Sequence, residues 1–372
     1  MKKIVMVRSN PVDPDSRVEK EANSLIKAGY HVQLVVWDRQ KNYCVRKDDK
    51  ALGNGCIPRV RFGAKAAYGA GMKSLISFLR FQISLFIWLI IHSRDYDVCH
   101  FCDFDTAFTG SLVCKLTKKK FVFDIFDYLS TDAKSRGQLM IKKLEDGVIN
   151  HAAATIICTE DRKRQIKDAH PQKLVIIHNT PVDTGKKPID ENDKPHKIKV
   201  AYVGILQDHR LLIEIGEYFT ENQNIELHIG GFGKFESYFE KLSKENDNIF
   251  YYGRLEYEKT IQLEQRCDIM LAIYDPEIGN HKFAAPNKFY ESLMLGKPVI
   301  MVKNTGMSQI VEENDIGVLI EYSKQGFIEG IRTLVSRQNE WPYMKQRMRK
   351  LYNENFNWET MEERLVELYN SL

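Results

Sequence analysis

Residues 286–300 read PNKFYESLMLGKPVI, a stretch that predicts a helix followed directly by a buried strand. Pro286 can stand in the first turn of the helix, where its missing N–H group costs no hydrogen bond. Gly296 is suited to end the helix, and Pro298 lies just beyond it. Lys288 and Glu291 are three residues apart, so their side chains project from one face.

The start of this helix, predicted over residues 287–295, suits a bound phosphate because its free N–H groups and its dipole both favour an anion. Lys288 would add positive charge against that phosphate. Glu291, one turn deeper, is placed to accept hydrogen bonds from ribose hydroxyls. The same spacing also fits an ordinary surface pair of side chains, so these residues alone leave both interpretations open.

Strand and helix patterns alternate on both sides of this stretch, which indicates parallel sheets covered by helices. The strands expected in the first half are 4–7, 32–37, 98–101, 121–123, 155–158 and 174–177. Those expected in the second half are 199–203, 225–229, 249–252, 269–273, 299–302 and 318–320. Two doubly wound units in succession would hold a ligand in the cleft between them, at the carboxyl ends of their strands.

The composition is that of a folded protein. A chain of 372 residues suits two domains, and its apolar (43%) and charged (28%) fractions exclude a disordered chain. Seven scattered cysteines favour a reducing compartment. The N-terminal apolar run is too short for a signal peptide, so we expect a cytoplasmic protein. Cys99 and Cys102 have no second Cys/His pair at zinc-finger spacing, so we expect no metal.

Charge is distributed unevenly along the chain. Residues 1–180 hold 30 Lys and Arg against 19 Asp and Glu, whereas residues 181–372 hold 24 against 31. A basic first half suggests an anionic partner, and uneven surface charge without a partner is the alternative. Nucleic acid is not expected, because the basic residues are not interleaved with aromatic stacking positions.

Residues 74–91 are apolar over nearly the whole circumference of a predicted helix, interrupted by Arg80 and Gln82. The unbroken apolar part is too short to span a bilayer. The segment is either a buried core helix or a helix that lies on a membrane surface. In the second case residues 59–91 would contact anionic lipid, with positive charge supplied by Arg59, Arg61, Lys65 and Lys73.

The chain resembles the retaining family 4 glycosyltransferases of the GT-B fold over nearly its whole length. Residues 286–300 are the most specific part of the resemblance. Weaker similarity is found in residues 15–32, 124–127, 203–210, 250–255, 268–271 and 356–371.

This resemblance implies an α/β GT-B architecture, in which two Rossmann-like doubly wound domains face a central cleft. Residues 1–182 would form the acceptor-side domain, and residues 183–198 the linker. Residues 199–355 would form the donor-binding domain. Residues 356–372 would form a C-terminal helix that crosses back to pack on the first domain.

Position by position, the resemblance implies that Arg210 neutralises the donor diphosphate, as a guanidinium fork can. Gly204 would let the backbone approach the phosphate, and Asp127 would lie near the transferred sugar. The expected catalytic residues are Asp127, Arg210 and Lys288. The expected donor-binding residues are Gly204, Arg210, Arg254, Asn287, Lys288 and Glu291. Arg17 and Asp103 are expected on the acceptor side.

The sequence departs from the family pattern at several positions. Phe283 stands where the family has a carboxylate, Ile215 where it has a lysine, and Phe126 where it often has a histidine. The N-terminal loop has residues 9–11, Ser-Asn-Pro, in place of a glycine pair. Candidate substitutes for the missing carboxylate are Asp275, Glu277 and His281.

The expected reaction is transfer of a sugar, with retention, from a UDP- or GDP-linked donor to a glycan or to a polyprenyl-diphosphate-linked saccharide. No metal or cofactor is expected, because the donor half has no D-x-D spacing; residues 103–105 have it but lie in the acceptor half. The enzyme would work in the cytoplasm or at the inner face of a membrane. A nucleotide-sugar 2-epimerase and a catalytically silent GT-B partner subunit remain alternatives.

Overall fold

The computed structural model describes residues 2–53, 55–66, 74–131, 133–185 and 197–372 and divides the chain into two compact units. Unit 1 comprises Met1–His178 and Met361–Leu372, and unit 2 comprises Asn179–Thr360. Most of the expected linker, residues 186–196, lies outside the described ranges. The C-terminal residues belong to unit 1.

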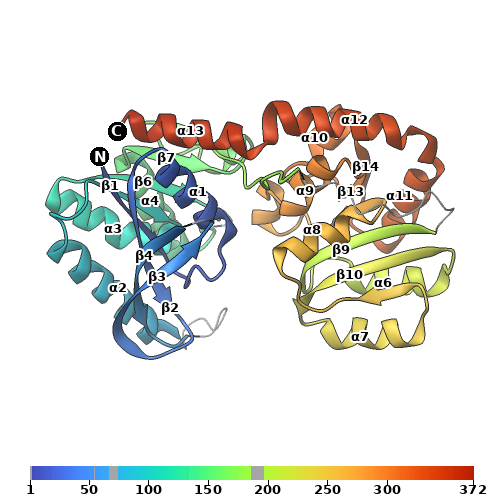
Figure 1. Ribbon diagram of the computed structural model, residues 1–372, viewed down its shortest axis with the longest axis horizontal. Helices are drawn as coiled ribbons and strands as arrows, with labels where there is room; N and C mark the ends of the chain where they lie inside the picture. Colours follow the sequence, from blue (N-terminus) through green and yellow to red (C-terminus); the bar gives the residue numbers. More distant parts are fainter. Residues whose placement is uncertain (1, 54, 67–73, 132, 186–196) are drawn as a thin grey trace. The chain divides into compact units, whose positions relative to one another are not determined.

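Unit 1 contains an eight-stranded sheet in the order β3-β4-β2-β1-β5-β6-β7-β8 (Figure 1). Its neighbouring strands pair in parallel except β3 and β4, which are antiparallel. The strands are β1 (Lys3–Arg8), β2 (His31–Asp38), β3 (Tyr43–Leu52), β4 (Gly55–Gly63), β5 (Val98–Cys102), β6 (Lys120–Ile125), β7 (Ala154–Ile157) and β8 (Leu174–Ile176). All six strands expected in the first half are present.

Helices cover both faces of this sheet. They are α1 (Ser16–Lys27), α2 (Leu75–Ile91), α3 (Phe104–Thr117), α4 (Arg136–His151), α5 (Arg162–Gln165) and α13 (Trp358–Asn370). Helices α2, α3 and α4 share one hydrophobic core with the sheet. On the other face, Ser24 of α1 donates a hydrogen bond to Glu362 of α13, and Tyr369 of α13 lies 2.7 Å from His100 of β5.

The β3–β4 hairpin was not predicted, and it changes the role of two arginines. Arg59 of β4 is buried and forms an ion pair with Asp48 of β3 at 2.8 Å. Arg61 pairs with Asp48 at 3.0 Å and with Asp38 at 2.7 Å. The expectation that these arginines attract anionic lipid is therefore wrong, because carboxylates within unit 1 already neutralise them.

Helix α2 confirms the helix expected over residues 74–91, but only one side of it is buried in the core. Only Phe81, Leu85, Trp88 and Leu89 are buried. Its other apolar side chains are partly or largely exposed to solvent. Among the residues that the structure describes, no helix is both long enough and apolar enough to cross a membrane.

Unit 2 contains six parallel strands in the order β11-β10-β9-β12-β13-β14. They are β9 (Ile198–Leu206), β10 (Ile225–Gly233), β11 (Ile249–Tyr251), β12 (Ile269–Ala272), β13 (Val299–Val302) and β14 (Gly317–Ile320). The main helices are α6 (Leu212–Glu221), α7 (Glu236–Glu245), α8 (Tyr257–Gln265), α9 (Asn287–Leu295), α10 (Ser308–Glu313), α11 (Lys324–Ser336) and α12 (Trp341–Leu351). Two hydrophobic clusters, one with α6, α7 and α11 and one with α9 and α10, fill the space around this sheet.

Helix α6 begins two residues later than the helix expected over residues 210–219. The cause is local, since His209 and Leu211 both adopt left-handed backbone conformations with φ of 65° and 53°. Arg210 therefore lies in the loop between β9 and α6 and not on the helix.

Candidate functional site

Lys288 and Glu291 of unit 2 are both buried, with 7% and 4% of their surface exposed. The interpretation as an ordinary surface pair is therefore wrong. Helix α9 begins at Asn287, and Gly296 ends it with a φ of 65°, the left-handed conformation that favours glycine. Lys288 lies in the first turn, so its charge and the free N–H groups of the helix start occur together.

Two tyrosine rings and a glycine surround the Lys288 ammonium. Its Nζ lies 4.6 Å from the centre of the Tyr202 ring and 5.7 Å from that of Tyr274. A Cβ atom added to Gly204 would lie 2.6 Å from Nζ, so a larger residue there would displace the ammonium. Burial alone would lower the pKa of Lys288, but Tyr274, Tyr202 and Glu291 raise it above its usual value. Lys288 is therefore a buried cation.

Arg210 lies against the same tyrosine. Its guanidinium carbon is 3.9 Å from the centre of the Tyr274 ring, and Nη1 donates to the His209 carbonyl at 2.9 Å. Nη1 also lies 3.1 Å from Nε2 of His281. Burial lowers the pKa of His281 and the nearby Arg210 lowers it further, so the imidazole is neutral and can accept this hydrogen bond. Two cations thus share one aromatic neighbour.

Asp275 holds the loop that carries Arg210. Its Oδ2 lies 2.7 Å from Nδ1 of His209, and its carbonyl lies 2.9 Å from Nδ1 of His281. Glu277, by contrast, is exposed. Of the three candidate substitutes for a carboxylate at Phe283, the structure therefore places Asp275 and His281 beside Arg210 and leaves Glu277 apart.

The remaining expected donor-binding residues have other neighbours. Arg254 is exposed, with its guanidinium carbon 4.7 Å from the centre of the Phe232 ring. Asn287 accepts a hydrogen bond from Asn179 at 2.8 Å. The structure thus brings Gly204, Arg210 and Lys288 together around Tyr274 and Tyr202, and it gives Arg254 and Asn287 different contacts.

Glu264 of α8 is a buried acid that the sequence did not single out. Neither of its carboxylate oxygens has a hydrogen-bond partner among the described residues. Burial raises the pKa of Glu264 well above its usual value, and the neighbouring Glu291 raises it further. Glu264 therefore holds its proton more tightly than an exposed carboxyl group does.

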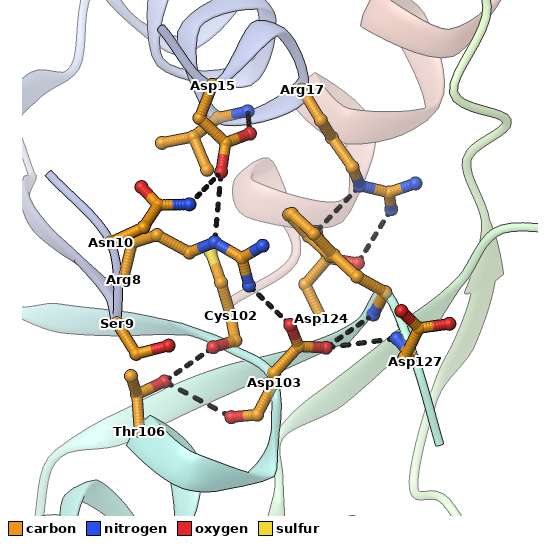
Figure 2. A network of polar contacts seen from close by, with 12 residues as sticks. Arg8, Ser9, Asn10, Asp15, Arg17, Cys102, Asp103, Thr106, Asp124 and Asp127 are labelled. Carbon is orange, nitrogen blue, oxygen red and sulfur yellow. Dashed lines mark hydrogen bonds and ion pairs between the residues drawn. The ribbon is translucent and has the colours of Figure 1, made fainter. Parts of the chain in front are cut away.

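In unit 1, Arg8 joins two carboxylates where β1 and β5 end (Figure 2). Its Nε lies 3.0 Å from Asp15, and its Nη1 donates to Asp103. Asp15 also accepts a hydrogen bond from Asn10 at 2.7 Å. Burial alone would lower the pKa of Arg8, but Asp103 and Asp15 raise it. Arg8 was not predicted as a site residue.

Asp103 holds the loop that carries Asp127 (Figure 2). Its Oδ1 accepts hydrogen bonds from the backbone N–H groups of Phe126 at 2.9 Å and Asp127 at 3.1 Å. Burial raises the pKa of Asp103 to about 6, although Arg8 acts to lower it. Asp103 therefore positions Asp127, whose own side chain is 73% exposed and lies 3.4 Å from Arg162.

Phe126 occupies the position where the family often has a histidine, and two guanidinium groups contact its ring. The guanidinium carbons of Arg8 and Arg17 lie 4.2 Å and 4.7 Å from the ring centre. Such cation–π contacts stabilise a cation and fix the ring together. An imidazole that became protonated between two arginines would be repelled, so phenylalanine suits this position.

Arg17 was expected on the acceptor side, but its guanidinium is buried and contacts the interior of unit 1. It donates to Asp124 through Nε at 3.1 Å and through Nη2 at 2.7 Å. Nη1 donates to the Ile177 carbonyl at 3.1 Å. With 4% of its surface exposed, Arg17 holds α1 and β6 together.

The cysteines at positions 99 and 102 lie on opposite faces of β5. Cys99 neighbours Cys114, whereas Cys102 neighbours Asp124. Potential ligand atoms of His100, Cys102 and Asp124 lie within 4.8 Å of one another. Both carboxylate oxygens of Asp124 already accept hydrogen bonds from Arg17, which makes this group a poor cation site.

Sequence reasoning missed Arg8, Tyr202 and Tyr274, although one signal could have indicated Arg8 and Tyr274. Arg8 ends β1, Tyr202 lies in β9, and Tyr274 follows β12 by two residues. In open parallel sheets, ligands bind beyond the carboxyl ends of the strands. Polar and aromatic residues at those ends are therefore candidates even without a motif.

Residues 184–351 match the family model described as Glycosyl transferases group 1. This match covers just under half of the chain and agrees with the glycosyltransferase resemblance found in the sequence. A search of curated proteins found no match.

Solved structures show the GT-B fold. The chain is similar to sucrose-phosphate synthase from Thermosynechococcus elongatus, with 13% identity, a TM-score of 0.77, and coverage of 100% of this chain and 99% of that one. It is also similar to Anabaena Alr3699/HepE in complex with UDP and glucose, with 14% identity, a TM-score of 0.73 and full coverage of both chains. UDP-GlcNAc 2-epimerase from Methanocaldococcus jannaschii has 14% identity, a TM-score of 0.63 and full coverage of both chains. The fold is therefore shared by transferases and an epimerase.

Proposed function

We propose that the chain transfers a sugar, with retention, from a UDP- or GDP-linked donor to a glycan or a lipid-linked saccharide. The observation that carries this proposal is the pair of buried cations, Lys288 and Arg210, beside Gly204 and the start of α9. Among the described residues, no ion pair joins either cation to a carboxylate. A nucleotide diphosphate would supply the missing negative charge.

The chemical task is to stabilise the diphosphate as it leaves the sugar. Lys288, Arg210 and the N–H groups at the start of α9 would do this by fixed electrostatic attraction, without a metal or a cofactor. Glu291 would bind the ribose hydroxyls. Asp127, held by Asp103, would lie near the transferred sugar and complete the catalytic set.

The test is sugar transfer by the Arg210→Ala and Lys288→Ala proteins, with Lys282→Ala as the matched control. Lys282 is an exposed lysine in the short 3-10 helix Gly279–Phe283 before α9. We expect each of the first two variants to lose transfer by about 100-fold or more, as is usual when one group that stabilises transition-state charge is removed. The control should keep its rate. Full transfer in both Arg210→Ala and Lys288→Ala would refute the proposal.

Epimerisation is the second candidate, favoured by the fold shared with the Methanocaldococcus jannaschii epimerase. An epimerase needs no acceptor, so incubation of a donor alone separates the two reactions. Isomerisation of the donor would indicate an epimerase. A donor that stays unchanged by itself and is consumed once an acceptor is added would indicate a transferase. Binding of the donor without either reaction would indicate a catalytically silent subunit. A thermal-shift panel of UDP- and GDP-sugars would identify the donor first.

For the acceptor, we propose a saccharide carried on a polyprenyl diphosphate, so that the enzyme works at the inner face of a membrane during polysaccharide synthesis. The basic first half of the chain supports an anionic acceptor of this kind. Acceptor preference can be tested by comparing transfer to a lipid-linked saccharide and to the same saccharide without its lipid.

A further inference from the structure

Three neighbouring helices of unit 1 expose apolar side chains on their outer side. Helices α2 and α3 are in contact, as are α3 and α4, and Figure 1 shows α2 and α3 side by side. Ile76 is 83% exposed, Leu116 67% and Met140 63%. The full set, here named the apolar face, is Leu75, Ile76, Leu79, Ile83, Phe86, Ile87 and Ile91 of α2, Phe108, Leu112 and Leu116 of α3, and Leu139, Met140, Ile141 and Leu144 of α4.

The spacing of these side chains makes α2 and α3 each contribute a stripe. On α3 they recur every four residues, at 108, 112 and 116, which is one side of a helix. On α2 they recur at three- and four-residue intervals from 75 to 91, while Phe81, Leu85, Trp88 and Leu89 face the core. Soluble proteins seldom leave so many neighbouring apolar side chains in water, so this face is suited to contact another apolar phase.

Basic residues border the apolar face. Lys134, Arg136 and Lys143 are exposed in and just before α4, whereas Lys142 is neutralised by Asp146 at 2.7 Å and Asp168 at 3.0 Å. Arg80 is the only charged residue of α2, and Lys115 is exposed on α3 beside Leu116. An apolar face bordered by Lys and Arg matches an anionic bilayer, whose headgroups attract the cations while its acyl chains accept the apolar side chains.

We propose that the apolar face docks unit 1 onto the surface of an anionic lipid bilayer. A second copy of this chain fits less well, because a two-fold contact would bring the basic borders of both copies together at its rim. The bilayer contact keeps the helix over residues 74–91 that the sequence suggested, adds α3 and α4, and leaves out Arg59 and Arg61.

The loop that carries Asp127 contacts α4, one of the three helices of the apolar face, because the Leu129 N–H donates to Glu145 at 3.1 Å. Leu129 is 63% exposed and lies two residues after Asp127, and the exposed residues of α4 follow in its first turns. A docked unit 1 would therefore hold this loop near the bilayer surface, where a lipid-linked acceptor lies. This last step rests on the proposed function, whereas docking itself does not.

The experiment is co-sedimentation of the full chain with phosphatidylcholine vesicles, with and without phosphatidylglycerol. The test variant is Ile76→Glu/Ile83→Glu/Ile87→Glu, and its matched control is Val182→Glu/Phe250→Glu/Tyr343→Glu. The control adds the same charge at exposed apolar residues of unit 2. A third variant, Arg136→Gln/Lys143→Gln, tests the basic border.

We expect the wild-type and control proteins to sediment with the anionic vesicles, and the test variant to bind at least about tenfold more weakly, since three buried apolar contacts are lost. The Arg136→Gln/Lys143→Gln protein should lose binding mainly to the anionic vesicles. Equal vesicle binding by the wild-type protein and the test variant would overturn the proposal. A wild-type protein that stays in the supernatant at low salt would also overturn the proposal. The same holds if the wild-type protein stays in the supernatant as a dimer and the test variant is a monomer, because the apolar face would then bind a second copy.

Nucleotide-sugar stabilisation of the test variant against heat separates this proposal from the proposed function. If docking alone is wrong, vesicle binding is absent while donor stabilisation persists. If the proposed function alone is wrong, vesicle binding persists while no nucleotide sugar stabilises the protein.

Discussion

The cations in the interior of the two units have different partners. In unit 1, Arg8 and Arg17 are each bound by carboxylates, Asp15 and Asp103 for the first and Asp124 for the second. In unit 2, Lys288 and Arg210 contact aromatic rings, a carbonyl and a neutral imidazole. A neutralised network is complete without a ligand and holds its loops in place. Buried cations with aromatic and neutral neighbours are suited to receive an anion.

The largest expected effect is on the stability of unit 1. In the Arg17→Ala protein, Asp124 would stay buried without its partner, which typically costs about 3–5 kcal/mol. Urea unfolding measures this loss. Arg164→Ala, which removes an exposed ion pair with Asp161, is the control and should cost less than about 1 kcal/mol. Equal costs for the two variants would show that the buried network does not hold unit 1 together.

The second effect separates activity from stability in unit 2. In the Lys288→Met protein, transfer should fall by about 100-fold or more, since a cation that stabilises the leaving diphosphate is gone. The free energy of unfolding should stay equal or rise, because a desolvated charge is replaced by an apolar side chain. Rates and urea midpoints measured on the same preparation test both parts. A large loss of stability would mean that Lys288 serves the fold of unit 2.

The third effect depends on pH. The pKa of Asp103 is raised to about 6, above the value near 3.9 expected in the unfolded chain. The folded state therefore stays protonated at Asp103 to a higher pH than the unfolded state does. As a result, the free energy of unfolding falls as the pH rises from about 4 to 6. Asp103→Asn removes that titration. The free energy of unfolding of the wild-type protein should fall by about 2 kcal/mol relative to that of the variant over this interval. A difference between the two proteins that does not change with pH would contradict this prediction.

The smallest effect concerns Gly204. In the Gly204→Ala protein the new Cβ would lie 2.6 Å from Lys288 Nζ, so the ammonium must move. We expect donor binding about tenfold weaker, or about 1.4 kcal/mol, as measured by calorimetric titration. Gly253→Ala is a fair control for alanine at a left-handed glycine, because no atom lies within 4 Å of a Cβ there. Similar losses in both variants would point to backbone strain and not to Lys288.

Several elements were predictable because their signals are local. Helix α9 was predicted to the residue, since its proline, its glycine and its apolar spacing all lie within the segment itself. The β3–β4 hairpin was missed because β3 is mostly polar and exposed, so it has no apolar pattern to reveal a strand. Helix α2 has apolar residues on all sides, so its sequence could not show which side is covered.

The sequence alone therefore determined the succession of strands and helices, the two-unit α/β class and the helix that carries Lys288 and Glu291. These depend on residues within a few positions of one another. Only the tertiary structure decided which charges are neutralised, because the partners are far apart in the chain, as with Arg8 and Asp103 or Arg17 and Asp124. It also decided that Lys288 and Glu291 are buried, since burial depends on the neighbouring elements that cover a helix face. The same dependence left the outer side of α2, α3 and α4 exposed.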